Sequence, residues 1–137
     1  MKLDVGHHLL FYTNTRSYGT LGVVPDGIVV QPGEGERVRR HRVLAELPEL
    51  EVFELRFSPD FDGVDLHRHA DHVDSFYVLE GEAEFMVDGN VVRAGPGTWV
   101  AAPVGIEHGF RVAGDTDLVM LNVHGPNTGF GERLRRD

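Results

Sequence analysis

Hydrophobic and polar residues alternate in short runs along most of this chain. From Val52 to Phe57, the apolar side chains Phe53, Leu55 and Phe57 fall on one face of an extended strand, and the residues between them fall on the other. Similar runs, separated by turns rich in Gly, Pro and Asp, predict about ten short strands. Residues 130–136 are expected to form one or two helical turns. The pattern predicts an all-β protein.

The strand expected to begin at Asp74 follows the same period of two. Asp74, Phe76 and Val78 fall on one face of this strand, whereas Tyr77 and Leu79 fall on the other. Because both faces carry large apolar side chains, we expect both to be largely covered in the folded protein.

Turn residues and length indicate how the chain is organised. Asp88-Gly89 lies between two apolar runs and predicts a two-residue β-hairpin turn of type I′, in which both residues have positive φ. A chain of 137 residues, 41% hydrophobic and 26% charged, fits one globular domain. We therefore expect a single domain over residues 1–137, with an N-terminal arm over residues 1–27.

Composition narrows the chemistry that the protein can carry. There is no cysteine, so histidine and carboxylate are the only strong metal ligands that the chain offers. The net charge of −9 opposes binding to nucleic acid or to an anionic membrane, and we expect neither as a partner. No run approaches the ~20 apolar residues of a membrane span, and a cytoplasmic location is the expectation.

Histidines and carboxylates gather in the segment from Gly63 to Gly81. His67 and His69 are two residues apart, so on one strand their imidazoles would point to the same face, and Asp74 follows after a short turn. Two imidazoles and a carboxylate suit a divalent first-row metal. The alternative is a polar loop in which histidine recurs by accident.

A second segment, residues 97–112, carries a further motif. Gly97, Pro103, Gly105 and His108 are spaced as in the second motif of the cupin superfamily, although Val112 stands where that motif has asparagine. In the first cupin motif, two histidines separated by one residue are followed by a glutamate and then a glycine. The two segments together resemble small single-domain cupins of the quercetin dioxygenase-like group.

Residues 63–81 match the first motif with one departure. His67, His69 and Gly81 fall in register, but Asp74 replaces the glutamate. The resemblance implies a double-stranded antiparallel β-barrel of the jelly-roll type, in which the two segments meet inside the barrel. The motif region spans residues 63–112 of the single cupin domain.

The resemblance implies one divalent transition metal ion, Fe, Mn, Ni, Co, Cu or Zn, held by His67, His69 and His108 with Asp74 as the fourth ligand. Aspartate is one methylene shorter than glutamate. Asp74 therefore ligates after a backbone shift, or orients a ligand imidazole, or leaves its place to His72. We expect His72 to be an exposed turn residue rather than a ligand.

Residues that share strand faces with the ligands are candidates to line a substrate site. They are Phe76, Val78, Phe110 and Val112, with Trp99 as a further candidate. An apolar, aromatic interior around one metal suits a flat organic substrate. The alternative is that these side chains form the core of the barrel.

The resemblance implies a mononuclear metal enzyme of dioxygenase type that acts on a small enolic or aromatic substrate. Glu54, Glu80 and Glu107 are candidate general bases, and nothing in the sequence selects one, so the catalytic residues stay unknown. The alternatives are a non-catalytic cupin that binds or senses a small molecule, and a metal-dependent isomerase or epimerase. An inward-facing histidine beyond the ligands would favour the isomerase.

One basic patch interrupts this acidic chain. Its arginines are Arg37, Arg39, Arg40 and Arg42. The patch would bind an anionic substrate or partner, or it is a solvated strand whose arginines pair with nearby glutamates, and the second interpretation is favoured. A homodimer is also expected from the resemblance.

Overall fold

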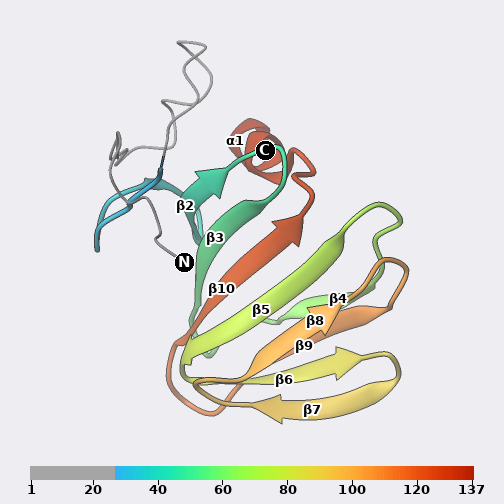
Figure 1. The fold of residues 1–137 in the computed structure, drawn as a ribbon. Helices are drawn as coiled ribbons and strands as arrows, with labels where there is room; N and C mark the ends of the chain where they lie inside the picture. The colour runs from blue at the N-terminus through green and yellow to red at the C-terminus, as the bar shows by residue number, and fades with distance from the viewer. Residues whose placement is uncertain (1–26) are drawn as a thin grey trace, which may run out of the picture.

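Two antiparallel β-sheets make up the part of the chain that the structure describes, residues 27–137 of a computed structural model (Figure 1). The N-terminal arm expected over residues 1–27 lies, except for Gly27, outside the described residues. The larger sheet has the strand order β1-β2-β3-β10-β5-β8. Its strands are β1 (Glu36–Val38), β2 (His41–Glu46), β3 (Glu51–Phe57), β10 (Leu118–Gly125), β5 (Val73–Glu80) and β8 (Trp99–Ala102).

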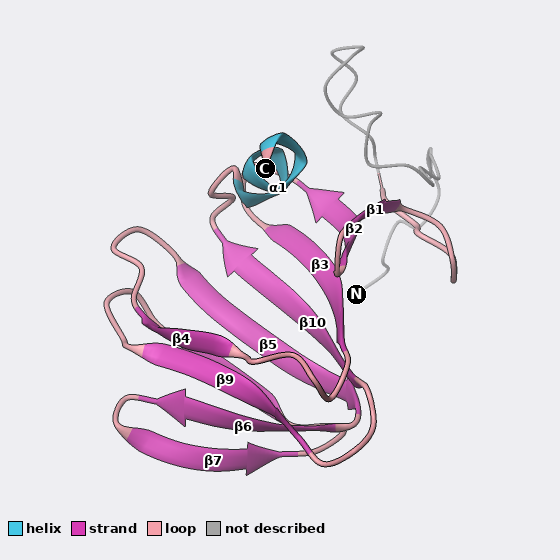
Figure 2. Cartoon of the chain, turned by 180° about the vertical axis from the view of Figure 1, so that it is seen from behind, coloured by secondary structure: helices cyan, strands magenta, loops and turns pink. Residues whose placement is uncertain are grey.

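The smaller sheet lies against the larger one and has the order β4-β9-β6-β7 (Figure 2). Its strands are β4 (Val64–His67), β9 (His108–Ala113), β6 (Glu82–Val87) and β7 (Asn90–Ala94). Within residues 27–137, no strand of one sheet pairs with a strand of the other, because β8 pairs only with β5 and β4 pairs only with β9. The expected barrel is therefore not closed by hydrogen bonds, and side chains hold the two sheets together.

The predicted alternation builds the core between the sheets. Phe53, Leu55 and Phe57 of β3 are 0%, 3% and 4% exposed, as the period of two predicts. On β5, Phe76 and Val78 are buried on the same inner face. Burying a large apolar side chain contributes about 1.5–3 kcal/mol, so these rows of side chains stabilise the packing of the two sheets.

The hairpin between β6 and β7 forms at the predicted turn. Asp88 and Gly89 have φ values of 48° and 76°, and the flanking residues Val87 and Asn90 are paired. A type I′ turn needs positive φ at both central positions, and its twist matches that of the strands it joins. The prediction of this hairpin from Asp88-Gly89 is confirmed.

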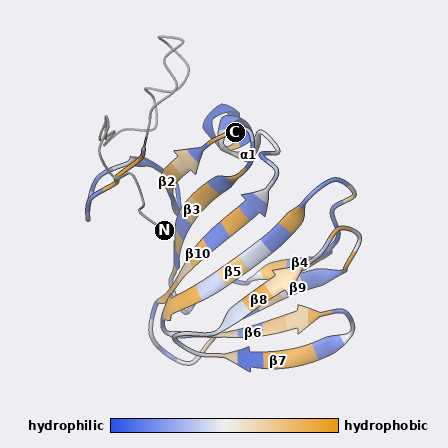
Figure 3. Cartoon of the chain, viewed as in Figure 1, coloured by the Kyte–Doolittle hydropathy of each residue, from blue (hydrophilic) through white to orange (hydrophobic). Residues whose placement is uncertain are grey.

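The outer face of β5 differs from the expectation. Tyr77 and Leu79 are 42% and 38% exposed, and Trp99, which pairs with Tyr77 from β8, is 65% exposed. Described residues therefore cover one face of β5 well and leave the other open. Apolar residues along both sheets, and the mainly hydrophilic helix, are visible in Figure 3.

One short helix, α1 (Phe130–Arg136), follows the last strand and confirms the predicted helical turns. Phe130 and Leu134 pack against the core, and Arg135 forms an ion pair with Glu46 at 2.7 Å. The basic residues of its last turn interact favourably with the negative end of the helix dipole. No helix within residues 27–137 is long and apolar enough to cross a membrane.

Candidate metal centre

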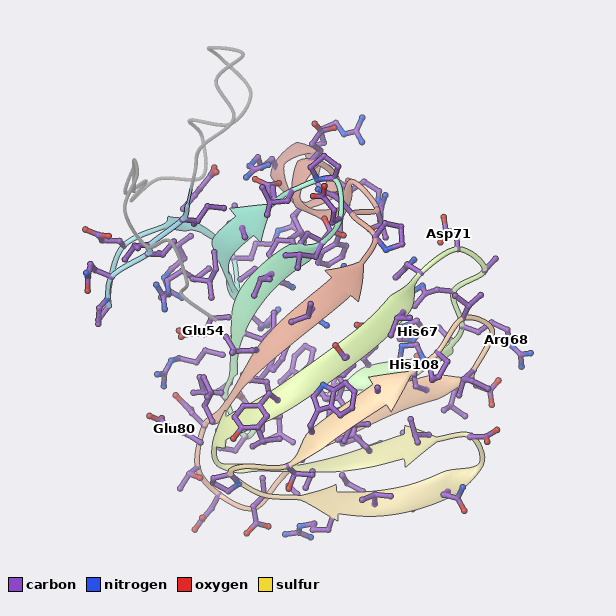
Figure 4. The ribbon with its side chains drawn as sticks, in the orientation of Figure 1. Glu54, His67, Arg68, Asp71, Glu80 and His108 are labelled. Carbon is purple, nitrogen blue, oxygen red and sulfur yellow. The ribbon has the colours of Figure 1, made fainter. Side chains whose placement is uncertain are left out.

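Four side chains from both sheets converge at one place. His67 ends β4, His108 begins β9 directly opposite it, and Asp74 is the second residue of β5 in the other sheet. Together with His69, they offer ligand atoms that all lie within 4.8 Å of one another. Figure 4 shows His67 and His108 side by side. We call these four residues the ligand cluster.

Backbone carbonyls orient two imidazoles of the ligand cluster. Nδ1 of His67 lies 2.8 Å from the carbonyl oxygen of Asp65, and Nδ1 of His108 lies 2.9 Å from that of Ile106. Because a carbonyl only accepts, each Nδ1 carries the proton and donates it. Nε2 of each ring therefore faces the cluster, and a bound metal would replace the proton that Nε2 of His108 donates to Asp74. Metal-binding histidines are commonly oriented by such carbonyl partners. The donor set fits a divalent first-row ion.

His69 joins the cluster from a loop rather than from a strand. β4 ends at His67, so the shared strand face expected for the two histidines does not extend to His69. Its ring still lies 4.8 Å from that of His67, and its Nε2 is 3.3 Å from Oδ2 of Asp74. Burial and the neighbouring His72 lower the pKa of His69, which favours the neutral imidazole that a metal requires.

Asp74 is the centre of the hydrogen bonds in the cluster. It is 4% exposed, and its Oδ2 lies 3.0 Å from Nε2 of His108. Its Oδ1 accepts a hydrogen bond of 2.7 Å from Asn122 and lies 3.3 Å from Nε2 of His124. Burial alone would raise the pKa of Asp74, but the hydrogen bonds from His108, His124 and Asn122 hold it well below its usual range. The carboxylate is therefore ionised and available to a cation.

Asn122 and His124 on β10 and Glu51 on β3 extend this network, and none of the three is among the site residues predicted from the sequence. Nδ1 of His124 lies 2.7 Å from Oε1 of Glu51, which is fully buried and also accepts from the Thr128 hydroxyl at 2.5 Å. Burial lowers the pKa of His124, but Asp74 and Glu51 outweigh it and raise the pKa to about 9. The strand alternation, which puts Asn122 and His124 on one face, was the available signal.

His72 is not the exposed turn residue that we expected. It is 6% exposed, its Nδ1 lies 2.7 Å from a carboxylate oxygen of Asp71, and its ring stacks on that of His69 at 4.0 Å. The loop folds back over the cluster, so His72 is covered while Asp71 points outward at the loop tip (Figure 4). Asp74, and not His72, contributes to the ligand cluster.

A cavity of about 380 Å³ lies beside the ligand cluster. Of the five residues expected to line a substrate site, Phe76 and Phe110 line this cavity. Val78 is fully buried in the core and Val112 packs against it, whereas Trp99 points outward from β8. Strand parity explains Trp99, because its partner Tyr77 lies on the outer face of β5.

The three glutamates considered as general bases lie outside this cavity. Glu54 pairs with Arg42 at 2.8 Å, and Glu107 pairs with Arg68 at 3.2 Å. Glu54 and Glu80 lie far from the ligand cluster in Figure 4. The titratable side chains that line the cavity beyond the ligand cluster include His41, His72 and His124.

Comparisons with known proteins agree with this architecture. A quercetin 2,3-dioxygenase from Bacillus subtilis (strain 168) is 28% identical over an alignment of 99 residues, and the match covers 65% of this chain and 29% of that enzyme. The chain thus spans less than a third of the length of this relative.

The match covers a larger share of two solved structures with similar folds. KdgF from Halomonas sp. superposes with a TM-score of 0.62 at 25% identity, covering 75% of this chain and 87% of that one. An RmlC-like cupin from Shewanella frigidimarina NCIMB 400 superposes with a TM-score of 0.60 at 23% identity, covering 66% and 78%. This second likeness concerns the fold alone.

The profile of the cupin domain matches residues 53–124, which are more than half of the chain. That range contains the whole ligand cluster together with Asn122 and His124. The chain belongs to the cupin family.

Proposed function

We propose that the protein is a mononuclear metal enzyme whose single divalent ion is bound by the ligand cluster. The observation that carries the proposal is the convergence of three imidazoles and one ionised carboxylate, from segments about forty residues apart, beside a cavity. The carbonyl partners of His67 and His108 support it, because they hold the imidazoles in the tautomer that ligates through Nε2.

The reaction that we propose is the dioxygenation of a small enolic or aromatic compound. Both atoms of O2 enter the substrate, and the substrate's own bonds supply the electrons that reduce O2. The bound ion contributes Lewis-acid and O2 chemistry. Likeness to a quercetin 2,3-dioxygenase supports this reaction class, and so do the aromatic side chains Phe57, Phe61, Phe76 and Phe110 along the cavity.

The residues around the cavity have separate roles in this proposal. Phe76 and Phe110 exclude water and pack against a flat substrate. Asn122 and His124 hold the Asp74 carboxylate toward the imidazoles, and Glu51 in turn orients His124. These three are positioning residues.

Metal analysis of the purified protein tests the ligand cluster. We expect about one ion per chain, and loss of the ion from His67→Ala and from His108→Ala. His72→Ala is the matched control, because it removes a neighbouring buried imidazole that is not in the cluster. Retention of stoichiometric metal by both ligand variants would contradict the proposed site.

Oxygen consumption tests the reaction. The metal-loaded protein is mixed with a panel of flavonols and small enols while an oxygen electrode records the O2 concentration. We expect consumption with at least one compound, at a rate that falls in step with metal content in His67→Ala. If no compound supports O2 uptake by the fully loaded protein, dioxygenation is ruled out as its activity.

A metal-dependent isomerase or epimerase is a second candidate, and a cavity histidine favours it. His72 lines the cavity beyond the ligand set and provides a group that can exchange protons, and this reaction needs no O2. Incubation of 2-hydroxy and 2-keto acids with the protein in D2O without oxygen distinguishes the two candidates. Deuterium at the carbon next to the carbonyl would favour the isomerase.

A further inference from the structure

We propose that Arg39, Arg40 and Arg133 bind the anionic group, a carboxylate or phosphate, of an organic ligand whose apolar body occupies the cavity beside the ligand cluster. All three arginines line that cavity. The inference rests on the proposed function, since it names the class of substrate that the same site accepts. We call these three residues the arginine cluster.

Distant segments of the chain supply the arginine cluster. Arg39 and Arg40 form the turn between β1 and β2, whereas Arg133 lies on α1. The charges of Arg39 and Arg40 are close enough to His41 to contribute to the lowering of its pKa. The ring of His41 contacts that of Phe130 at 5.5 Å, and the guanidinium of Arg133 lies over the same ring at 5.9 Å. One phenyl ring therefore links the two parts of the cluster.

The basic patch seen in the sequence divides into paired and unpaired arginines. Arg42 forms the expected ion pair with a nearby glutamate, Glu54, at 2.8 Å, although the two side chains are only 12% and 22% exposed. Arg39 and Arg40, by contrast, make no ion pair with any residue from 27 to 137. In a chain of net charge −9, unpaired guanidinium groups beside a cavity are available to an anionic ligand.

The nearest competing groups do not neutralise the cluster. The charge of Arg40 helps to lower the pKa of Asp60, after the Ser58 hydroxyl, but the two form no ion pair within 4 Å. Arg133 donates to the carbonyl oxygen of Thr128 at 2.7 Å and to its hydroxyl oxygen at 3.4 Å, and because both acceptors are neutral, the charge of Arg133 stays uncompensated.

Aromatic rings connect the arginine cluster with the ligand cluster. The guanidinium of Arg40 lies 4.7 Å from the centre of the Phe61 ring, which stacks on Phe57 at 4.5 Å. Phe57 contacts Phe110 at 5.4 Å, and Phe110 follows His108 by two residues on β9. A flat apolar body along these rings would have its charged group at Arg40 and its other end at the ligand cluster.

His41 adds a neutral polar group near the same arginines. Its Nδ1 is buried and has no hydrogen-bond partner among the described residues. Burial, with the charges of Arg40 and Arg39 contributing, lowers the pKa of His41 to about 4, so the imidazole is neutral at pH 7. His41 therefore adds no positive charge to the arginine cluster at pH 7.

The experiment titrates benzoate, phenyl phosphate and benzamide into the full-length protein, with binding followed by isothermal titration calorimetry. The three probes share a ring and differ in charge. We expect at least one anion to bind about tenfold more tightly than benzamide, because charge-assisted hydrogen bonds to guanidinium are among the stronger ones. The better of the two anions identifies carboxylate or phosphate as the preferred group.

Variants locate the binding. The double variant Arg39→Gln/Arg40→Gln should lose about tenfold in anion affinity and keep its affinity for benzamide. Arg37→Gln is the matched control, because Arg37 is an exposed arginine of β1 that does not line the cavity. Circular dichroism verifies that each variant is folded. Equal affinity of benzamide and both anions, or no binding of any probe, would overturn the inference.

Titrations of metal-free protein and of His67→Ala separate this inference from the proposed function. If metal-free protein still binds the anion, and the double arginine variant weakens that binding, the inference stands even where the metal or oxygen assay fails. If anion binding disappears in His67→Ala but survives in the double arginine variant, the anion binds at the ligand cluster. That result overturns the inference and leaves the proposed function intact.

Discussion

The ligand cluster and the arginine cluster contact one cavity, yet they solve the problem of charge in opposite ways. Asp74 is 4% exposed and bonded to imidazoles and an amide, so the folded chain itself satisfies its charge. Arg39 and Arg40 are exposed and have no ion-pair partner among the described residues. A buried charge is stable only with partners that the fold itself supplies. An exposed charge is solvated by water and can therefore stay unpaired until a ligand binds.

Asp74→Ala, which removes the central carboxylate of the buried network, should cause the largest loss of stability. Removing the carboxylate leaves His124 and His108 without their shared acceptor, and removal of one partner from a buried charged network costs about 3–5 kcal/mol. Chemical denaturation of metal-free protein measures the loss in free energy of unfolding. A loss below about 1 kcal/mol would mean that the network contributes little to stability.

The pH dependence of stability should come from the same network. The pKa of His124 is raised to about 9, so its contribution is full below the unfolded value near 6.5 and is lost as pH rises toward 9. The pKa of Asp74 is lowered, so its contribution is present above about pH 4 and is lost as pH falls.

Metal-free protein should therefore be most stable between about pH 4 and 6.5, and should lose about 3 kcal/mol by pH 9. Urea denaturation across this range provides the measurement. His124→Gln is the control, and most of the loss between pH 6.5 and 9 should disappear in it. An unchanged alkaline loss in that variant would assign the effect to other groups.

Gly109→Ala should disturb the geometry that joins β4 to β9. A Cβ at position 109 would lie 2.6 Å from the backbone carbonyl oxygen of Val64, so one of the two strands must shift. We expect a loss of about 1–3 kcal/mol in unfolding free energy, and weaker metal binding because His67 moves relative to His108. Gly95→Ala is the control, since a Cβ there meets nothing within 4 Å. Equal metal affinity in the two variants would contradict this account.

The smallest expected change in unfolding free energy concerns the difference between a paired arginine, Arg42, and an unpaired one, Arg40. Arg42→Gln removes the partner of Glu54 and should cost about 0.2–1 kcal/mol, whereas Arg40→Gln should change the unfolding free energy by less than about 0.5 kcal/mol. Thermal denaturation of the two variants gives the comparison. A larger loss for Arg40→Gln would indicate that Arg40 has a structural role.

Sequence reasoning reached much of the fold because the period of two is a local property. Phe53, Leu55 and Phe57 are buried as the alternation predicts, and Asp88-Gly89 forms the hairpin turn because its φ values depend on those two residues themselves. Motif spacing also selected the four members of the ligand cluster, which the fold brings together.

Other features depend on contacts that no local pattern encodes. Glu51 and His124 are 73 positions apart, and their pairing follows from the register of β3 against β10. His72 is buried only because its loop folds over the cluster, and Trp99 is exposed because β8 presents that side chain outward.

The sequence by itself determined the alternating strands, the turns, the cupin motifs and the histidines that they carry, because each is set by neighbours within a few positions. Only the tertiary structure decided that the two sheets stay unclosed, that Asn122 and His124 support Asp74, and that Arg42 is paired while Arg40 is not. The physical reason is that burial and charge pairing depend on which distant strands meet. Alternation along one strand specifies its two faces but does not specify which other strand covers each face.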